Sequence, residues 1–378
     1  MDGRNDTGGT MSTEQEAIDQ VAEAFDRNTD PLKEYESAFE ELDVDPLEAY
    51  IDRVLIPNGS SGSTLDNYRY SYDQWRTVMD ELGRHAACPS DRHVKQFVIS
   101  LRDEHGNVGS TINKKLNNVN RAYEWWQEHH AFPHPTDYNP FKIAKREIDL
   151  SGDSNVGDYP PLNVSELRDI IQNCLHVRDR LFIVWPLKFA LRAGALLNIH
   201  LEDIALSHGS IKHEYPSLGT AAALDGYENV LYIPSRDERE GNKSHRSRIL
   251  PLDDEARRVL IQFLQTRPTV DSPNLIVSER TYEPMDDSEH VSVVWKDHFE
   301  GVNNSAEYEK YRNIRSHYGR NFFTNYWKIQ EDIPRELVQY MRGDKLGKST
   351  SGEAIDEYLE AHYGDIRDLY LDQIFKLL

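Results

Sequence analysis

The chain has 378 residues, enough for two domains, and its 38% hydrophobic and 10% aromatic content can build buried cores, which excludes a largely disordered protein. No run approaches the roughly 18 apolar residues of a membrane span, and the first residues lack the basic and then apolar layout of a signal peptide, so we expect a cytoplasmic protein. The formal net charge is −22, whereas a protein that binds nucleic acid is ordinarily basic.

The negative charge is spread over the whole chain. Asp and Glu number 65 against 43 Lys and Arg, a composition that resembles the proteins of salt-loving archaea. In molar salt the Debye length is about 3 Å, so a general negative field does not repel DNA beyond direct contact. Two interpretations therefore stay open: a DNA-binding protein that works in high salt, and an acidic protein that never meets DNA.

The two cysteines, Cys88 and Cys174, fall in different predicted domains and have no metal-ligand spacing. Such sparse use of cysteine suits a reducing compartment. We expect neither a disulfide bond nor a bound metal ion.

Residues 1–45 form an acidic N-terminal segment with 14 acidic and 3 basic side chains. Its first residues, rich in Gly, Thr and Asp, are expected to be disordered. Ile18, Val21 and Phe25 recur at helical spacing, which predicts a short amphipathic helix able to dock on the body of the protein.

Residues 46–148 are predicted to form a compact helical domain. Four helix starts are indicated by Asp45, Ser63, Ser90 and Gly109, each followed by apolar residues at steps of three or four. The apolar positions are Leu47, Tyr50, Ile51 and Val54, then Tyr68, Tyr72 and Trp75, then Val94, Phe97 and Leu101, and then Leu116, Val119, Tyr123 and Trp126.

Basic side chains surround the fourth of these helices and follow it. Lys114, Lys115 and Arg121 belong to the helix, and Lys142 and Lys145 come after Asn139-Pro140-Phe141. Such a cluster can contact DNA phosphates, although a solvated charged face explains it equally well.

The chain from 149 to 161 has no periodicity and is bounded by helix breakers, so we interpret it as a linker to a second domain over 162–378. Asn163 is predicted to cap the first helix of that domain, with Glu166 completing a capping box. A second helix covers 178–191, where Pro186 is expected to kink or end it.

Strand-like segments follow at 210–213, 230–235 and 247–252, and the last two flank a charged turn. Helices are predicted from residue 254 to the C-terminus. The fold class we expect is therefore mostly α with a small antiparallel β-sheet.

Two basic residues in this domain stand where they could meet an anion. Arg192 follows the apolar run that ends the second helix, and burying its charge unpaired would be costly. Lys243 lies in the charged turn, from which an ammonium can reach a phosphate. Alone, the first could form an internal ion pair and the second could be a solvated surface lysine.

His317 and Arg320 are spaced to share one helical face. Ser316 is predicted to cap their helix and to place both side chains in its first turn, where free N–H groups favour an anion. Downstream, Tyr358 and Tyr363 are candidate nucleophiles, although either could be a core aromatic residue.

The order of these residues resembles the catalytic domain of the tyrosine recombinases, the phage-integrase family. The stretches similar to family motifs run from Phe189 to Ile204 around Arg192, from Asn242 to Leu252 around Lys243, and from His317 to Arg320, ahead of a late tyrosine. Residues 46–148 are similar to the family's helical core-binding, SAM-like domain. Together the resemblance covers about 46–378.

The resemblance implies an enzyme that cleaves and rejoins DNA strands through a 3′-phosphotyrosyl intermediate, without ATP or a metal ion. Arg192 and Arg320 would clamp the phosphate, His317 would orient it or take the phenol proton, and Lys243 would protonate the leaving 5′ oxygen. Tyr358 would be the nucleophile, with Tyr363 as its alternative. Family members act as tetramers on two DNA duplexes and exchange a C-terminal helix, for which residues 365–378 are suited.

Two positions depart from the family pattern. Ala195 stands where the family usually has a glutamate, so a supporting carboxylate is missing or comes from elsewhere. Asp344 stands where the family usually has a histidine, and an anion there should repel the phosphate, so we expect Lys345 to supply the donor. These departures keep two alternatives open: a catalytically decayed DNA-binding protein and a type IB topoisomerase-like enzyme.

Overall fold

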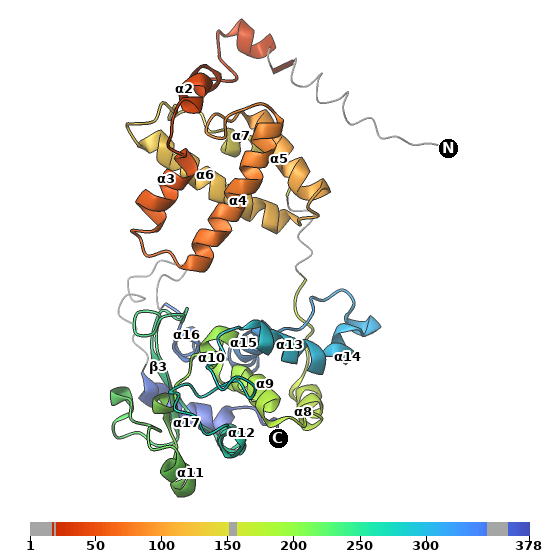
Figure 1. Cartoon of the computed structure of the whole chain (residues 1–378). Coiled ribbons are helices and arrows are strands. Elements are labelled where there is room, and N and C mark those ends of the chain that lie inside the picture. The colour runs from red at the N-terminus through yellow and green to blue at the C-terminus, as the bar shows by residue number, and fades with distance from the viewer. Residues whose placement is uncertain (1–16, 19, 151–156, 346–361) are drawn as a thin grey trace. The chain divides into compact units, whose positions relative to one another are not determined.

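The computed structural model describes residues 17, 18, 20–150, 157–345 and 362–378. The chain forms two compact units, Met1–Asn155 and Val156–Leu378, which are shown in Figure 1. Helices dominate both, and the second also contains a three-stranded antiparallel sheet, so the predicted fold class is confirmed. Within the described ranges, no helix is long and apolar enough to cross a membrane.

The first unit is a helical bundle around an aromatic core. Tyr72, Trp75, Phe97, Tyr123 and Trp126, all predicted inward positions, are buried, which confirms the helical pattern. Two predicted caps are also present, because Asp45 accepts from the amides of Leu47 and Glu48, and Ser90 forms a capping box with His93. The helices are α2 (Glu36–Glu40), α3 (Pro46–Tyr50), α4 (Gly62–Glu81), α5 (Asp91–Asp103), α6 (Gly109–Glu128) and α7 (Pro140–Glu147).

Part of the acidic N-terminal segment belongs to this core. Leu32 and Phe39 are buried in it, and Arg84 forms an ion pair with Asp30 at 2.7 Å. The predicted amphipathic positions Ile18, Val21 and Phe25 remain exposed. The segment is therefore docked from about residue 30 onward, and not through its first helical stretch.

The second unit is built around α9 (Val177–Phe189), which is buried along most of its length and contacts α12 (Asp254–Thr266), α13 (Glu289–His298) and α15 (His317–Asn325). Of the two effects expected for Pro186, a kink or the end of the helix, the second does not occur, because α9 continues to Phe189. Gly319 of α15 lies against this proline so closely that an added Cβ would come within 2.9 Å of the Pro186 carbonyl carbon. This contact fixes the start of α15 against the end of α9. The other helices are α8 (Val164–Gln172), α10 (Ala193–Leu197), α11 (Gly209–Glu214), α14 (Glu300–Asn303), α16 (Arg335–Arg342) and α17 (Tyr363–Gln373).

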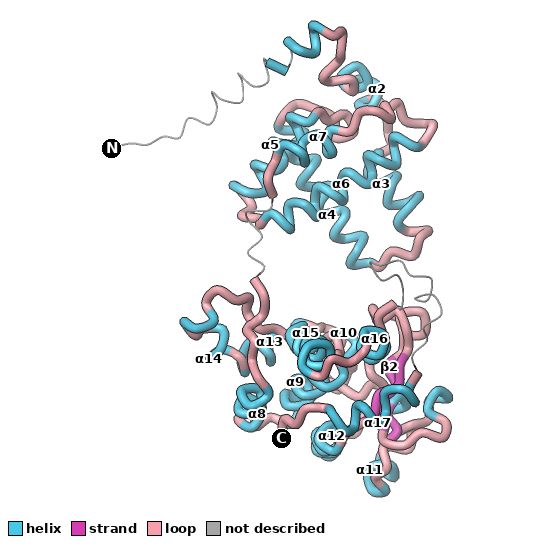
Figure 2. Tube along the Cα trace, turned by 180° about the vertical axis from the view of Figure 1, so that it is seen from behind, coloured by secondary structure: helices cyan, strands magenta, loops and turns pink. Residues whose placement is uncertain are grey.

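The sheet has the order β1-β2-β3, with β1 (Ile204–Ala205), β2 (Val230–Ile233) and β3 (Arg248–Pro251) all antiparallel to their neighbours. Figure 2 shows β2 in magenta near α17. The predicted strand at 210–213 is wrong, since these residues lie in α11. His208 accepts from the amide of Ile211 and so caps a short helix there. A window of four residues is too short for periodicity to separate the two structures.

The C-terminal segment packs on its own unit. Ile366, Tyr370 and Phe375 are buried in the same core as α9. Beneath the segment, the fully buried ammonium of Lys188 lies 2.7 Å from Asp253 Oδ2 and 2.9 Å from Glu255 Oε2, and Lys188 also donates to the carbonyl of Phe375. The segment is thus tied to the buried charges of α9 and α12.

Candidate active site

Three of the predicted site residues line one pocket of the second unit. The pocket has a volume of about 340 Å³, and its walls include Arg192, Lys243 and His317. These residues come from three separate parts of the chain, the start of α10, the turn between β2 and β3, and the start of α15. The fold therefore brings together side chains that the sequence places up to 125 positions apart.

A strained turn positions Arg192. The last turn of α9 is closed by Ala190 in the left-handed conformation, with φ of 51°, which costs a residue with a Cβ about 1 kcal/mol. The chain then leaves α9, and Arg192 becomes the N-cap residue of α10. Within the described part of the chain, its guanidinium has no hydrogen-bond or ion-pair partner, so it is available to an anion in the pocket.

His317 and Arg320 lie in the first turn of α15, as predicted, but Ser316 does not cap the helix. Its backbone is helical and its side chain accepts no amide; its hydroxyl lies 3.3 Å from that of Ser292. His317 is exposed at the pocket wall, whereas Arg320 is only 2% exposed. The pair is therefore unequal, with one residue at the pocket and the other behind it.

Arg320 is held by acceptors from two directions. Its Nη1 donates to the carbonyl of Ala190 at 2.8 Å and to that of Arg342 at 2.9 Å, and its Nη2 donates to Asp344. The strained Ala190 thus has a second role, because its carbonyl fixes Arg320. Both predicted arginines are positioned by the same turn at the end of α9.

Two further arginines complete the cluster, and the sequence interpretation assigned them no role. Arg342 Nε lies 2.8 Å from Asp344 Oδ2, and its Nη1 donates to Thr324. Arg248, on β3, is 2% exposed, and its Nη1 donates to Ser244. Arg248 shares the strand face of Leu250, so its inward direction could have been predicted from the two-residue period.

These positive charges shift one another's pKa. Burial, and then the neighbouring charges, lower the pKa of Arg320 and of Arg248, although a guanidinium stays protonated at neutral pH. Incomplete solvation at the pocket wall, and then the charges of Arg320 and Arg192, also lower the pKa of His317 below its ordinary value of 6.5. The imidazole is therefore neutral at pH 7 in a strongly positive surrounding.

The sequence suggested that Asp344 would repel the phosphate, but in the structure its charge is paired. Its carboxylate is paired with Arg320 and Arg342, so two guanidinium groups offset the repulsion expected between this anion and a phosphate. The Asp344 segment is also joined to the Lys243 turn, because the amides of His245 and Arg246 donate to the carbonyl of Gly343. Lys345 follows with an exposed side chain.

Of the two candidate nucleophiles, Tyr358 lies outside the described residues. Tyr363 begins α17 and is half-buried, and its ring packs edge-on against Tyr227 with 5.1 Å between centroids. Burial raises the pKa of Tyr363, which opposes formation of the phenolate. Across the described ranges, no group of His, Cys, Asp and Glu side chains is suited to hold a metal ion.

The five basic residues predicted to contact DNA in the first unit differ in availability. Lys115 is only 7% exposed; it donates to Asn107 and lies over the ring of Tyr70, and burial lowers its pKa, so it is not presented to a phosphate. The other four are Lys114, exposed on α6; Arg121, which donates to the hydroxyl of Tyr68; Lys142, paired with Glu124; and Lys145, bonded to Asn117.

Comparison with solved structures shows the same fold in DNA integrases. A fragment of the Tn1549 transposon integrase, solved with a circular intermediate DNA, is 15% identical, with a TM-score of 0.55 over 86% of this chain and 98% of that one. Lambda integrase, solved as a tetramer on a Holliday junction, is 16% identical, with a TM-score of 0.55 over 91% of this chain and 88% of that one.

No protein-family model and no curated protein matches the sequence. At 15 to 16% identity the structural likeness establishes the fold, and it does so over both units. The resemblance to tyrosine recombinases is thus confirmed at the level of the fold.

Proposed function

We propose that this chain, which has the fold of the tyrosine recombinases, is a site-specific DNA recombinase that cleaves and rejoins strands through a 3′-phosphotyrosyl intermediate. The observation that carries the proposal is the convergence of Arg192, Lys243 and His317 on one pocket, with Arg320 fixed directly behind it. A cluster of guanidinium groups beside a neutral imidazole suits a phosphodiester whose charge grows in the transition state.

Each side chain has a distinct role in the proposed reaction. Arg192 binds the non-bridging oxygens of the scissile phosphate, and Arg320 contributes positive charge from behind. His317 accepts the phenol proton as the tyrosine oxygen attacks phosphorus. Lys243 donates a proton to the 5′ oxygen as its bond to phosphorus breaks, and the reverse steps rejoin the strands.

We assign Tyr358 as the nucleophile. The half-buried Tyr363 supports this choice, since its packing and raised pKa make it the poorer candidate. Lys345 remains our candidate for an additional phosphate donor. No cofactor enters the scheme, because the energy of the cleaved bond is kept in the phosphotyrosyl link.

The partner we propose is double-stranded DNA in the cytoplasm, bound at high salt by a tetramer. Lys114, Arg121, Lys142 and Lys145 would contact phosphates from the first unit. The integrases with this fold were solved on DNA, one of them as a tetramer, which supports this assembly. The C-terminal segment, which packs on its own unit here, would exchange between protomers.

The test is trapping of a covalent adduct. The protein is incubated in molar KCl with duplexes of randomised sequence that carry a nick, so that cleavage releases a short fragment and leaves protein on the DNA. Sequencing of the adducts gives the target site, and mass spectrometry gives the modified residue. We expect adducts at one preferred sequence, on Tyr358, and none with Tyr358→Phe.

Three other outcomes would contradict parts of the proposal. Absence of any adduct contradicts strand cleavage and favours a decayed DNA-binding protein. Adducts without sequence preference, together with relaxation of supercoiled plasmid by the monomer, favour a type IB topoisomerase. An adduct that survives Tyr358→Phe but is lost in Tyr363→Phe moves the nucleophile.

The lowered pKa of His317 predicts the pH dependence of cleavage. The base form is lost only when the pH falls below that pKa, so the rate should be constant from about pH 8 down to about 6.5 and decline below it. Measured with subsaturating DNA, this pH profile reports the pKa of His317 in the DNA-free protein. His317→Gln should cleave about 10²-fold more slowly and lose the acidic limb. A wild-type limb centred above pH 6.5 would contradict the assignment.

A further inference from the structure

The Lys243 turn (residues 234–247) is unusually well fixed for a charged hairpin turn. Asn242 and Ser244, on either side of the exposed Lys243, are 8% and 2% exposed. Asn242 Nδ2 donates to the carbonyl of Pro234 at 2.9 Å, and the carbonyl of Ser244 accepts from the amide of Arg236 at 2.9 Å. Both neighbours of Lys243 are therefore held, whereas its ammonium has no hydrogen-bond or ion-pair partner within the described ranges.

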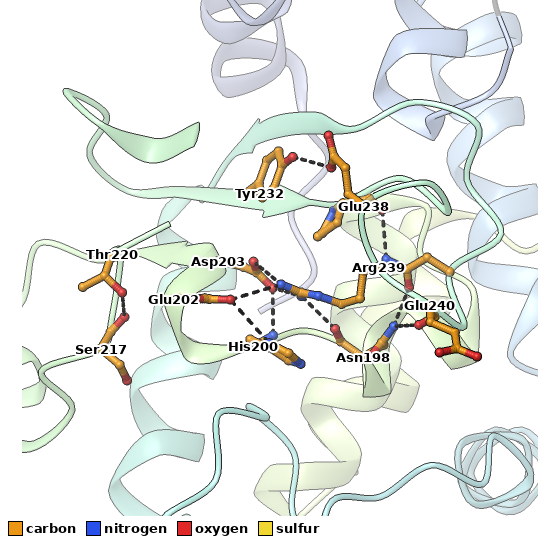
Figure 3. A network of polar contacts seen from close by, with 12 residues as sticks. Asn198, His200, Glu202, Asp203, Ser217, Thr220, Tyr232, Glu238, Arg239 and Glu240 are labelled. Atoms are coloured by element: carbon orange, nitrogen blue, oxygen red, sulfur yellow. Dashed lines mark hydrogen bonds and ion pairs between the residues drawn. The ribbon is translucent and has the colours of Figure 1, made fainter. Parts of the chain in front are cut away.

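One arginine joins this turn to another part of the chain, as Figure 3 shows. Arg239 forms a two-pronged contact with the buried carboxylate of Asp203, in which Nη2 donates to Oδ1 at 3.0 Å and Nη1 donates to Oδ2. Arg239 Nη2 also lies 3.3 Å from Glu202, and Nη1 donates to the carbonyl of Asn198 at 3.1 Å. The guanidinium is thus surrounded by oxygen atoms of residues 198–203.

Residues 198–203 directly follow α10, whose N-cap residue is Arg192. A second bond strengthens the connection, because Asn198 Nδ2 donates to the carbonyl of Glu240 at 2.9 Å and to Asn242 Oδ1 at 3.0 Å. The contacts of Arg239 and Asn198 therefore tie the turn that brings Gly241 and Lys243 to the pocket to the segment that follows its lining residues 192–195.

We propose that Arg239, through Asp203, is a positioning residue that fixes the Lys243 ammonium in the pocket that Arg192 also lines. This inference rests on the proposed function, in which Lys243 protonates the leaving 5′ oxygen. Proton transfer requires the donor within about 3 Å of that oxygen. Without the contact between Arg239 and Asp203, the turn would sample positions from which Lys243 cannot reach the leaving oxygen. The arginines that bind the phosphate would keep their places.

The test uses the chemistry of the leaving group. Two duplexes are made with the target sequence recovered by adduct sequencing, one with the natural 5′ oxygen at the scissile position and one with sulfur in its place. A thiolate is a far weaker base than an alkoxide and leaves without a proton, so the sulfur duplex does not need the acid. Single-turnover adduct formation is measured on both duplexes.

We expect Lys243→Ala to slow cleavage of the oxygen duplex by about 10²-fold and that of the sulfur duplex by less than about 3-fold. Arg239→Met should give the same pattern with a loss of about 10-fold or more on oxygen, and Asp203→Asn should match it. The double variant Arg239→Met with Lys243→Ala should be no slower than Lys243→Ala alone. Arg236→Met is the matched control. Its side chain, in the same turn, is 54% exposed and has Asp237 as its ion-pair partner among the residues that the structure describes, so this variant should behave as wild type.

Normal cleavage of the oxygen duplex by Arg239→Met overturns the inference, as does an equal loss on both duplexes, which would mean that the variant damages the fold or the phosphate site. The inference is also overturned if Lys243→Ala cleaves the sulfur duplex as slowly as the oxygen duplex, because Lys243 is then not the acid. The proposal of strand cleavage would not be affected by that result. Wild type that forms no adduct with either duplex contradicts the proposed function itself.

Discussion

Arg192→Ala should lower the rate of strand cleavage by about 10³-fold and leave the fold intact. The guanidinium faces the pocket without a hydrogen-bond or ion-pair partner in the described part of the chain, so its removal exposes no unpaired internal group. Removing one preorganised donor to a transition-state oxyanion typically costs 10² to 10³ in rate. Single-turnover adduct formation at saturating protein measures the effect, with thermal unfolding as the check on the fold.

Two variants sharpen this prediction. Arg192→Lys keeps the charge but loses the two-pronged geometry, so it should recover only part of the rate. Arg280→Ala removes an exposed guanidinium from a surface loop and should leave the rate unchanged. Cleavage by Arg192→Ala within about 3-fold of wild type would contradict the phosphate-binding role, and a large drop in melting temperature would show that Arg192 acts on the fold.

Much of the fold could be predicted from local sequence because its signals act over a few residues. The capping box of Asn163 and Glu166 is present as predicted, with the Asn163 amide donating to Glu166 at 2.7 Å. The strand predicted at 210–213 is wrong because a local signal over four residues carries too little periodicity to separate a strand from a helix. Local sequence also could not tell whether Pro186 ends its helix. The proline has no amide to donate to the carbonyl of Phe182, and the indole of Trp295, distant in sequence, donates to that carbonyl at 2.9 Å.

The site could be predicted less completely. Arg192, Lys243 and His317 follow from motif order, and Arg248 could have been assigned inward from the strand period. The partners of Asp344 and Arg239 could not, because an isolated charged turn does not indicate which of its arginines meets a buried carboxylate 36 residues away. Ion pairs between distant segments are fixed by tertiary packing and not by local pattern.

Asp344 explains how the cluster tolerates so much positive charge. Burial, and then the charges of neighbouring arginines, lower the pKa of Arg192, Arg248 and Arg320. The carboxylate of Asp344 opposes this shift at all three. Two unit charges 4 Å apart interact by about 4 kcal/mol at an effective dielectric constant of 20. Ala195 carries no carboxylate, whereas Asp344 places one against Arg320 and Arg342.

Asp344→Ala should therefore destabilise the DNA-free protein by about 2 kcal/mol and slow cleavage by about 10 to 100-fold, because Arg320 and Arg342 lose their shared acceptor. Asp344→Asn, which keeps one acceptor oxygen, should lie between this variant and wild type. Denaturant unfolding and single-turnover cleavage measure the two effects. Asp368→Ala is the control, since its carboxylate also pairs with an arginine but is 81% exposed, so its removal should change stability by less than about 0.5 kcal/mol. Faster cleavage by Asp344→Ala would mean instead that the carboxylate repels the phosphate.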